Sequence, residues 1–296
     1  MSYRILITGA DSFIGTSCER YLAKWPEKYI VDTIDMTDLK WQEKSFRGYD
    51  VVFHVAGIAH QDTRELTEAA QLMYRKVNCD LVIETAKKAK AEGVKQFIYM
   101  SSMIVFGVSG KVGKTRMIDA DSRPAPVNYY GRTKLAAEEG IQPLADDSFR
   151  VVIMRPPMIY GQGCKGNYPR MSGFVKKAKL FPKVRNCRSM LYIENFAEFL
   201  RLVIENGEAG VFYPQNEQYT NTSEMVKLIA EANGRRMVLL PGLGWLVWLA
   251  GRFDGTINKV FGSLSYDREL SKYKENYCIY SLEESVRRTE AGEKEL

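Results

Sequence analysis

The sequence predicts an α/β fold in which a parallel sheet is wound on both faces by helices. Short apolar segments with strand character alternate with helical segments as far as residue 155, which is the pattern of such a sheet. Several of these strands, such as residues 51–57 and 96–102, end in small or hydroxyl residues. The alternation changes beyond residue 160, so we expect a smaller C-terminal α/β lobe there.

The first strand leads into a turn that contains glycine. Residues 3–8 carry the apolar run of a strand buried on both faces. Gly9 permits turn conformations and a close approach of the backbone to a ligand, and Gly15 lets the following helix pack tightly. The N–H groups of that helix suit a pyrophosphate. Ser12 stands where the dinucleotide fingerprint has its middle glycine, so this stretch alone also fits an ordinary strand-turn-helix.

Composition narrows the classes of function. The 296 residues include 45% hydrophobic and 26% charged side chains, enough for one large α/β unit or two lobes. The net charge of +6 is modest, and Lys and Arg are spread along the chain without a long basic block interleaved with aromatics, so no nucleic-acid partner is expected. Five cysteines without a CxxC pair and only two histidines predict a reducing, cytoplasmic location and no metal site. With the first strand beginning at residue 3, we expect neither a signal peptide nor membrane insertion.

An acidic residue follows the second predicted strand, residues 29–35. Asp35 lies 20 residues past Gly15, where a carboxylate accepts hydrogen bonds from the adenine ribose and disfavours a 2′-phosphate. This position predicts NAD rather than NADP. In the alternative interpretation, Asp35 and Asp38 form a turn near the adenine because the strand from residue 51 follows so soon. A strand of the usual set would then be shortened or missing.

The strand from residue 51 ends in Ala56 and Gly57, small residues that let a cofactor pass over the sheet edge. His54 within it is interpreted as a core residue rather than a catalytic base. Residues 66–91 form a long helical pattern that is interrupted around Val77 and Asn78 and closes at a C-terminal glycine.

Three residues could carry redox chemistry. Tyr130 and Lys134 are four residues apart and would share one face of the helix predicted at residues 130–140. A nearby ammonium would lower the pKa of the Tyr130 phenol, which is otherwise about 10. Ser102, at the end of a predicted strand, could hydrogen-bond a substrate oxygen. Together with a nicotinamide, these residues make a site for proton and hydride transfer.

The C-terminal half predicts further helices. Residues 223–233 form one, with Ser223 as its expected N-cap. The apolar run at residues 241–253, with Trp245 and Trp248, is too short to span a bilayer. We interpret it first as a packed helix, with a dimer contact or a membrane-surface helix as alternatives.

In order and together, the motifs resemble those of the extended short-chain dehydrogenases, the NAD-dependent nucleotide-sugar epimerase/dehydratase group. The resemblance covers most of the chain and implies a Rossmann-type NAD-binding domain at residues 1–160 and a mostly substrate-binding lobe at residues 161–296, some segments of which return to the Rossmann core. It implies the catalytic trio Ser102, Tyr130 and Lys134, and a substrate site that includes Ser102, Met103, Asn167 and Arg188. Implied cofactor contacts are Gly9, Ser12, Phe13, Ile14, Gly15, Asp35, Ala56, Gly57, Tyr130, Lys134, Pro157 and Met158. The motifs that carry the resemblance are Thr8-Gly9-Ala10-x-x-Phe13-Ile14-Gly15, His54-Val55-Ala56-Gly57, Val77-Asn78, Ser101-Ser102-x-x-Val105-Phe106-Gly107, Tyr130-Gly131-x-x-Lys134 and Arg155-Pro156-Pro157-Met158-Ile159-Tyr160-Gly161.

The implied reaction is at C4 of a nucleotide sugar, most often a UDP sugar. A 4-epimerase that recycles NAD is placed first, and an NADH-dependent reductase of UDP-4-keto-6-deoxy-hexosamines is nearly equal. A 4,6-dehydratase is disfavoured because Met103 follows Ser102 where such dehydratases carry an acid. A non-catalytic dinucleotide-binding module remains a third reading. The resemblance also implies a homodimer and a role in polysaccharide precursor synthesis. Two departures from the family pattern are Ser12 and the short segment between residues 30 and 50.

Overall fold

The computed structural model describes residues 2–58, 66–108 and 110–291. The chain divides into two compact units, each assembled from separated segments. The first unit comprises Met1–Gly107, Arg123–Pro156 and Ala197–Tyr213. The second comprises Val108–Ser122, Pro157–Phe196 and Pro214–Leu296.

A six-stranded parallel sheet forms the centre of the first unit, with strand order β10-β6-β4-β3-β1-β2. The predicted α/β fold with a parallel sheet is therefore confirmed. The inner strands of this sheet are almost wholly buried, which explains why their sequences are continuous apolar runs. The strands are β1 (Tyr3–Thr8), β2 (Tyr29–Ile34), β3 (Val51–His54), β4 (Gln96–Met100), β6 (Arg150–Met154) and β10 (Gly210–Phe212).

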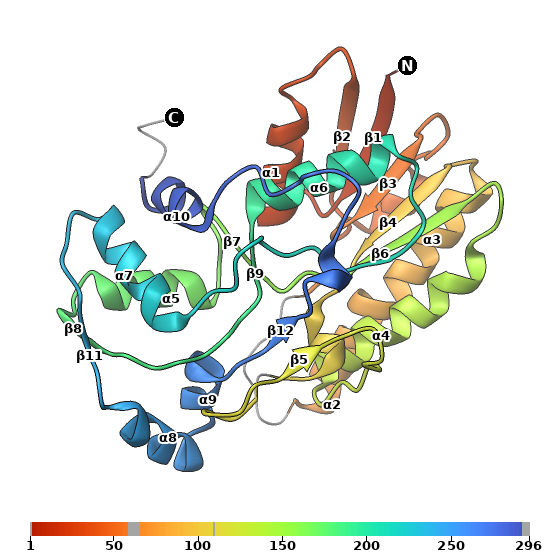
Figure 1. Cartoon of the computed structure of the whole chain (residues 1–296). Helices are drawn as coiled ribbons and strands as arrows, with labels where there is room; N and C mark the ends of the chain where they lie inside the picture. Colours follow the sequence, from red (N-terminus) through yellow and green to blue (C-terminus); the bar gives the residue numbers. More distant parts are fainter. Residues whose placement is uncertain (1, 59–65, 109, 292–296) are drawn as a thin grey trace. The chain divides into compact units, whose positions relative to one another are not determined.

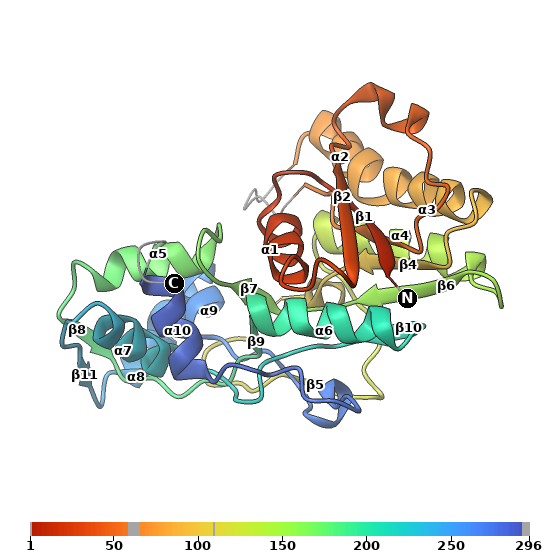
Figure 2. The same ribbon diagram turned by 90° about the horizontal axis from the view of Figure 1, so that it is seen from above.

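Helices cover both faces of this sheet (Figure 1, Figure 2). The helices α2, α3 and α4 lie on one face, while α1 and the part of α6 in this unit lie on the other. Short 3-10 turns, η1, η3 and η4, connect these elements. Their bounds are α1 (Phe13–Leu22), η1 (Leu39–Glu43), α2 (Glu68–Arg75), α3 (Leu81–Ala91), η3 (Met103–Phe106), α4 (Tyr129–Ile141), η4 (Gln142–Leu144) and α6 (Ile193–Glu205).

The sheet ends at β2, because the chain between β2 and β3 forms only the turn η1. All of this connection is described, and it contains no strand. The part of the alternative in which a strand of the usual set is shortened or missing is thus confirmed, whereas a shared turn of Asp35 and Asp38 is not formed. Asp35 and Asp38 each cap their own turn: Asp35 accepts from the N–H of Thr37 at 2.8 Å and Asp38 from that of Lys40 at 2.9 Å.

The predicted interruption of the long helical pattern is a π-helical segment, η2 (Lys76–Asp80), between α2 and α3. It turns the side chain of Asn78 into the interior, where it is fully buried. The pattern closes as predicted at Gly93, whose φ of +85° is open to glycine without strain.

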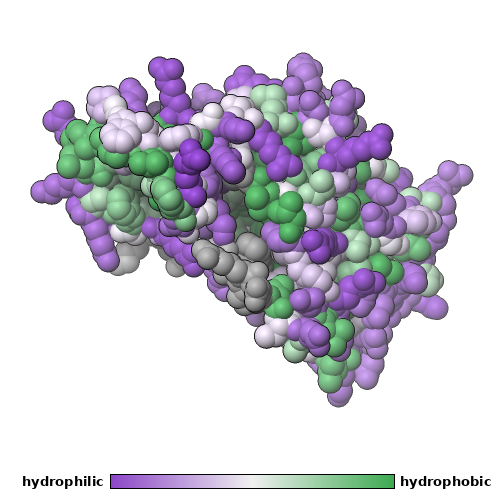
Figure 3. Space-filling view, turned by 90° about the horizontal axis from the view of Figure 1, so that it is seen from below, coloured by the Kyte–Doolittle hydropathy of each residue, from purple (hydrophilic) through white to green (hydrophobic). Residues whose placement is uncertain are grey.

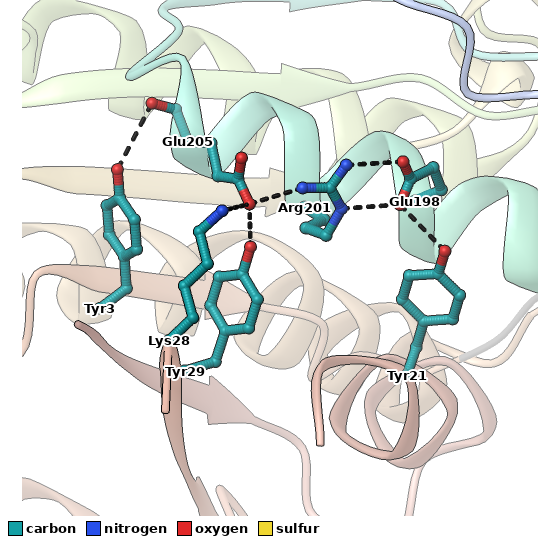
Figure 4. A network of polar contacts seen from close by, with 7 residues as sticks. All are labelled: Tyr3, Tyr21, Lys28, Tyr29, Glu198, Arg201 and Glu205. Carbon is teal, nitrogen blue, oxygen red and sulfur yellow. Dashed lines mark hydrogen bonds and ion pairs between the residues drawn. The ribbon is translucent and has the colours of Figure 1, made fainter. Parts of the chain in front are cut away.

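A polar network fastens α6 to the strands and helix beneath it (Figure 4). Arg201 lies between two carboxylates, with contacts of 2.7 Å to Glu198 and 2.6 Å to Glu205. Tyr21 of α1 donates to Glu198 at 2.9 Å, and Tyr29 of β2 donates to Glu205. These partly buried contacts attach residues near 200 to the N-terminal strands.

The second unit contains three parallel strand pairs and a set of helices. Tyr160 lies at its centre, stacked on Tyr168 at 5.2 Å between ring centroids and hydrogen-bonded to Ser285 at 2.5 Å. The pairs are β5 (Met117–Ile118) with β12 (Ser265–Tyr266), β7 (Met158–Tyr160) with β9 (Met190–Tyr192), and β8 (Leu180–Pro182) with β11 (Val238–Leu240). The helices and turn are α5 (Asn167–Val175), α7 (Thr222–Ala232), α8 (Gly244–Phe253), α9 (Gly255–Phe261), η5 (Glu269–Ser271) and α10 (Leu282–Glu290).

One sequence prediction in this unit is wrong. The N-cap of α7 is Asn221, whose side-chain oxygen accepts from the N–H of Ser223 at 2.9 Å. Ser223 lies inside the helix, and its hydroxyl accepts from the N–H of Val184 instead. The predicted packing of the apolar helix α8 is met only in part: Gly251 of α8 lies close to Val112 and to Ile257 of α9, but no residue of α8 is buried. Across the described residues, no helix combines the length and the apolar character needed to span a membrane.

Candidate active site

The turn after β1 approaches the end of β3 very closely. A Cβ placed on Gly9 would lie 3.0 Å from the backbone N and Cα of Ala56, so no larger residue fits. The N–H groups of Gly9 and Ala10 both donate to the carbonyl of Ile34, at 2.9 and 3.2 Å. The ends of β1, β2 and β3 are therefore held together at one edge of the sheet, where open α/β sheets bind their ligands.

Ser12, which stands where the dinucleotide fingerprint has its middle glycine, is the N-cap of α1. Its hydroxyl accepts from the N–H of Gly15 at 3.1 Å, and a Cβ on Gly15 would lie 2.7 Å from that oxygen. Within the described residues, no acceptor is hydrogen-bonded to the N–H groups of Phe13 and Ile14. These two donors and the Gly9 cradle fit the pyrophosphate of a dinucleotide.

Asp35 follows β2 directly and is exposed. The Thr37 N–H and hydroxyl both donate to it and hold the pKa of its carboxyl below the ordinary value. Asp35 is thus an anion next to Ile34, the residue that anchors the glycine turn. This position is compatible with the predicted contact to ribose hydroxyls.

The helix α4 begins one residue before Tyr130 and is capped by Asn128, whose Oδ1 accepts from the N–H of Gly131 at 2.7 Å. One turn further on, Lys134 is buried, with its Nζ 5.9 Å from the centroid of the Tyr130 ring. The same ammonium donates to the carbonyl of Met100 at 2.8 Å. A Cβ on Gly57 would lie 3.6 Å from this Nζ, so the lysine also meets the loop after β3.

Ser102 is brought to the same region by the turn η3. Ser102 caps this turn by accepting from the N–H of Ile104 at 3.2 Å. A Cβ on Gly131 would lie 2.9 Å from the carbonyl of Ile104, so η3 packs on the first turn of α4. The chain therefore places Ser102, two residues after the carbonyl that holds Lys134, beside the start of the Tyr130 helix.

The pKa of Tyr130 is raised in the structure, whereas the sequence predicted that it is lowered. Burial, with a smaller contribution from Tyr74, raises the pKa of Tyr130 to about 12. Burial lowers the pKa of Lys134 to about 8, against the opposing effect of Glu138. In the chain alone, burial therefore opposes the predicted phenolate form of Tyr130.

A buried ion pair supports α4, and it was not predicted from the sequence. Glu138 pairs with Arg155 at 2.5 Å, and Ser101 donates to the same carboxylate. Glu138 lies one turn after Lys134. The sequence signal that could have identified it is the i, i+4, i+8 spacing of Tyr130, Lys134 and Glu138, which places the three residues on one face of the helix. Both charged groups are buried, which ties α4 to the end of β6.

Asn78 is a second supporting residue without a predicted role. Its side chain accepts from the N–H of Ile58 at 2.8 Å and donates to the carbonyl of Ile58 at 3.1 Å. It thereby holds the backbone of Ile58, the residue after Gly57. His54 is a buried core residue, as predicted, and its Nδ1 lies 3.0 Å from the hydroxyl of Thr8.

Of the remaining predicted residues, one follows Ser102 in the first unit and the others belong to the second unit. Met103 is buried in η3, and its N–H donates to the carbonyl of Pro156. Arg188 belongs to the second unit, where its Nη1 donates to the carbonyls of Lys259 and Val260 at the end of α9. Asn167 is the exposed first residue of α5. Pro157 and Met158 also belong to the second unit, immediately before and at the start of β7.

Acidic, histidine and cysteine side chains do not gather anywhere in the described part of the chain in a group of three that could hold a metal ion. The chemistry of the cluster is that of hydroxyl, phenol and ammonium groups next to a dinucleotide cradle.

Comparison with known proteins agrees with this geometry. Residues 5–214 match the model of the NAD dependent epimerase/dehydratase family. The chain is 30% identical over 300 residues to a UDP-glucose 4-epimerase of Vibrio cholerae, covering 92% of this chain and 89% of that protein. It is 24% identical to an N-acetyl-α-D-glucosaminyl-diphospho-ditrans,octacis-undecaprenol 4-epimerase of Escherichia coli O157:H7, covering 80% and 74%.

Among solved structures, the fold is similar to that of dTDP-4-dehydrorhamnose reductase from Bacillus anthracis in complex with NADP. The TM-score is 0.71 at 19% identity, over 98% of this chain and 99% of that one. At this identity the likeness concerns the fold alone. The family match extends over most of the chain and includes the glycine turn, Ser102, Tyr130 and Lys134. The chain therefore belongs to the NAD-dependent epimerase/dehydratase family and is an enzyme of the extended short-chain dehydrogenase type.

Proposed function

We propose that this enzyme is an NAD-dependent 4-epimerase of a UDP-hexose or UDP-N-acetylhexosamine. The observation that carries the proposal is the position of Lys134, one turn after Tyr130, whose ammonium donates to the carbonyl of Met100, two residues before Ser102, and lies 3.6 Å from a Cβ placed on Gly57. The Vibrio cholerae relative, which spans nearly the whole chain, supports a UDP-sugar substrate and the epimerase reaction.

In this mechanism, Tyr130 removes the proton of the C4 hydroxyl while Ser102 donates a hydrogen bond to the same oxygen. A bound nicotinamide dinucleotide would supply the hydride acceptor and donor for C4. Lys134 would hold the nicotinamide ribose and stabilise the phenolate of Tyr130. Bringing the Tyr130 pKa from about 12 to near 7 requires about 7 kcal/mol of differential stabilisation. We infer that Tyr130 becomes an effective base only when the positive charge of oxidised cofactor is added to that of Lys134.

The second candidate is an NADH-dependent 4-ketoreductase of a UDP-4-keto-6-deoxy-hexosamine. The observation that favours it is the edge position of β2. In the described residues no strand lies beyond β2, and Asp35 is exposed, so the adenine side of a cofactor bound there would be less enclosed. A cofactor that is consumed in each turnover must leave, whereas a recycled one can stay. A non-catalytic dinucleotide-binding module is the third candidate.

The first experiment separates the two enzyme reactions. We expect purified protein to release close to one NAD per chain on denaturation, and to interconvert UDP-glucose or UDP-N-acetylglucosamine with their C4 epimers without added cofactor. Little bound cofactor, with NADH oxidation on addition of a 4-keto sugar, would establish the reductase instead. The same sugars on a polyprenyl diphosphate carrier are assayed in parallel, because the Escherichia coli relative is named for such a substrate.

Replacement of Tyr130 tests whether the site is catalytic. Tyr130→Phe removes the proton-transferring hydroxyl and should lower kcat by about 10²- to 10⁴-fold. Its matched control is Tyr129→Phe, the preceding residue of α4, for which we expect less than a twofold change. Equal turnover by both variants and the wild type would support the non-catalytic module.

We also propose a homodimer that pairs through α4 and the α2–α3 helices. Leu72 and Met73 of α2 are exposed apolar side chains that support this face. Light scattering should give a dimer mass for the wild type and a monomer mass for Leu72→Glu/Met73→Glu. A monomeric wild type would contradict the proposal.

A further inference from the structure

The helix α8 is apolar around its whole circumference, and yet it is exposed. Its sequence, Gly-Trp-Leu-Val-Trp-Leu-Ala-Gly-Arg-Phe, has one charged residue, Arg252. Trp245, Trp248 and Phe253 are 63%, 47% and 85% exposed. A helix that is hydrophobic on all sides is normally buried in a protein or a membrane. Such a contiguous patch on a chain marks an interaction surface.

This surface is visible in the space-filling view from below. Figure 3 shows a green area at the end where Figure 1 places α8, with purple side chains beside it. We call the exposed apolar side chains of α8 the α8 surface. It consists of Trp245, Leu246, Trp248, Leu249 and Phe253.

Basic segments lie next to the α8 surface. Residues 110–116, 176–185 and 235–262 together contain twelve Lys or Arg residues and one acidic residue, Asp254. The strand pairing brings the second segment to the third, since Val238 donates to the carbonyl of Lys179 at 3.0 Å. The strand β11 ends only a few residues before α8. Although Lys and Arg are spread along the sequence, these basic segments together concentrate positive charge in the second unit.

The segment of residues 110–116 contacts α8 and α9 directly. The N–H of Val112 donates to Asn258 at 2.9 Å, and the side chain of Asn258 donates to the carbonyl of Gly251 at 2.5 Å. A Cβ on Gly113 would lie 3.6 Å from the Trp248 ring. Lys111 and Lys114, both exposed, are therefore held beside the α8 surface.

We propose that the α8 surface docks this enzyme on an anionic lipid bilayer. Tryptophan and leucine side chains enter the boundary between headgroups and acyl chains, and neighbouring Lys and Arg side chains attract anionic headgroups. At about 1.5 Å per residue, a helix of this size is about 15 Å long and lies along the surface rather than across it. The proposal does not depend on which C4 reaction the enzyme performs.

A second copy of the chain fits the α8 surface less well. In a two-fold contact the same patch meets itself, so the basic segments of both copies would face each other. Like charges across an interface oppose association. An anionic bilayer instead neutralises the positive charge while it covers the tryptophans.

Vesicle flotation tests the proposal with the full-length enzyme. We expect it to bind vesicles of phosphatidylcholine with about one third phosphatidylglycerol at least tenfold more than vesicles of phosphatidylcholine alone, and to lose most of that binding in 0.5 M NaCl. On binding, the fluorescence of Trp245 and Trp248 should shift to shorter wavelength. Equal binding to both vesicles, or no binding to either, would overturn the proposal.

Three variants localise the effect. Trp245→Ser/Trp248→Ser should lower vesicle binding at least tenfold, and Lys111→Gln/Lys114→Gln about threefold. The matched control Ile30→Ser/Leu39→Ser removes exposed apolar side chains in the other unit, outside the proposed dimer face, and should bind like the wild type. Because both tryptophans are exposed, we expect unchanged thermal unfolding. If the Trp variant binds vesicles like the wild type, or if its only effect is to dissociate a wild-type dimer, the bilayer proposal fails.

Discussion

Ser12 occupies the loop position that the dinucleotide fingerprint gives to glycine, and its hydroxyl caps α1 through Gly15. Ser12→Ala should lower the free energy of unfolding by about 1 kcal/mol, and Ser12→Gly by only a few tenths, as measured by urea denaturation. The matched control is Ser17→Ala, since Ser17 donates to a carbonyl within the same helix. We expect Ser17→Ala to change the stability by less than about 0.5 kcal/mol. Equal losses for Ser12→Ala and Ser17→Ala would contradict the capping role.

Asp35 should determine the choice between NAD and NADP. Because Thr37 keeps the pKa of this carboxyl low, Asp35 is ionised at neutral pH and would repel a 2′-phosphate of a cofactor bound as we propose. Asp35→Asn should shift the ratio of NADPH to NADH affinity by about tenfold, roughly 1.4 kcal/mol, towards NADPH in fluorescence titrations. Asp38→Asn changes the neighbouring carboxylate and should leave the ratio unchanged. If the two variants behave alike, Asp35 does not contact the ribose.

The proposed catalytic residues could be identified from the sequence because their spacing and order are local signals. Tyr130 and Lys134 share a helix face, and Ser102 follows a strand by two residues. Glu138 was not identified and Asn78 was given no supporting role, since the roles of a buried charge and a buried amide are recognisable only from their partners. The predicted direction of the Tyr130 pKa shift was wrong for a similar reason. The sequence spacing shows the nearby lysine but not the desolvation of the phenol.

The junction of α4 with β6 depends on the buried pair of Glu138 and Arg155. Glu138→Ala would leave the Arg155 charge in the interior without its carboxylate, and should cost about 3–5 kcal/mol in urea unfolding. Glu139→Ala, an exposed position on the same helix, should cost less than about 0.5 kcal/mol. A loss of similar size in both variants would show that the pair does not stabilise the junction.

Strands and helices of the first unit were predicted to within a few residues, because buried parallel strands are continuous apolar runs. The π-helical segment was anticipated as an interruption at Asn78. Two elements of the second unit were not. The cap of α7 falls on Asn221 rather than Ser223 because Asn221 also donates to the carbonyls of Val184 and Asn186. The exposure of α8 contradicts the usual fate of an apolar helix, and no pattern within its ten residues distinguishes the two cases.

The stability of the whole chain should depend on pH through His54. Burial, with a smaller effect of the Lys134 charge, lowers the pKa of this imidazole from 6.5 to about 3. Because the folded state resists protonation, the contribution of His54 is complete above pH 6.5 and is lost as the pH falls towards 3. In that window the free energy of unfolding should fall by about 1.4 kcal/mol per pH unit more than in His54→Gln.

Urea unfolding at several pH values compares these slopes, so a lower absolute stability of the variant does not matter. A wild-type NMR titration provides the second measurement, in which the His54 resonance should keep its neutral shift down to about pH 4. Parallel slopes, or a His54 that titrates near pH 6.5, would contradict the prediction.

The division of the chain into interleaved segments also sets an order of events during synthesis. The first unit lacks its outer strand β10 and its α6 network until residue 213 has been made. At about 5–20 residues per second, a ribosome needs about 10–40 s to reach that point. During this time the apolar inner strands have emerged while one edge of the sheet is still unfilled. The nascent chain therefore passes through a stage in which β6 offers an open edge to chaperones or to neighbouring chains.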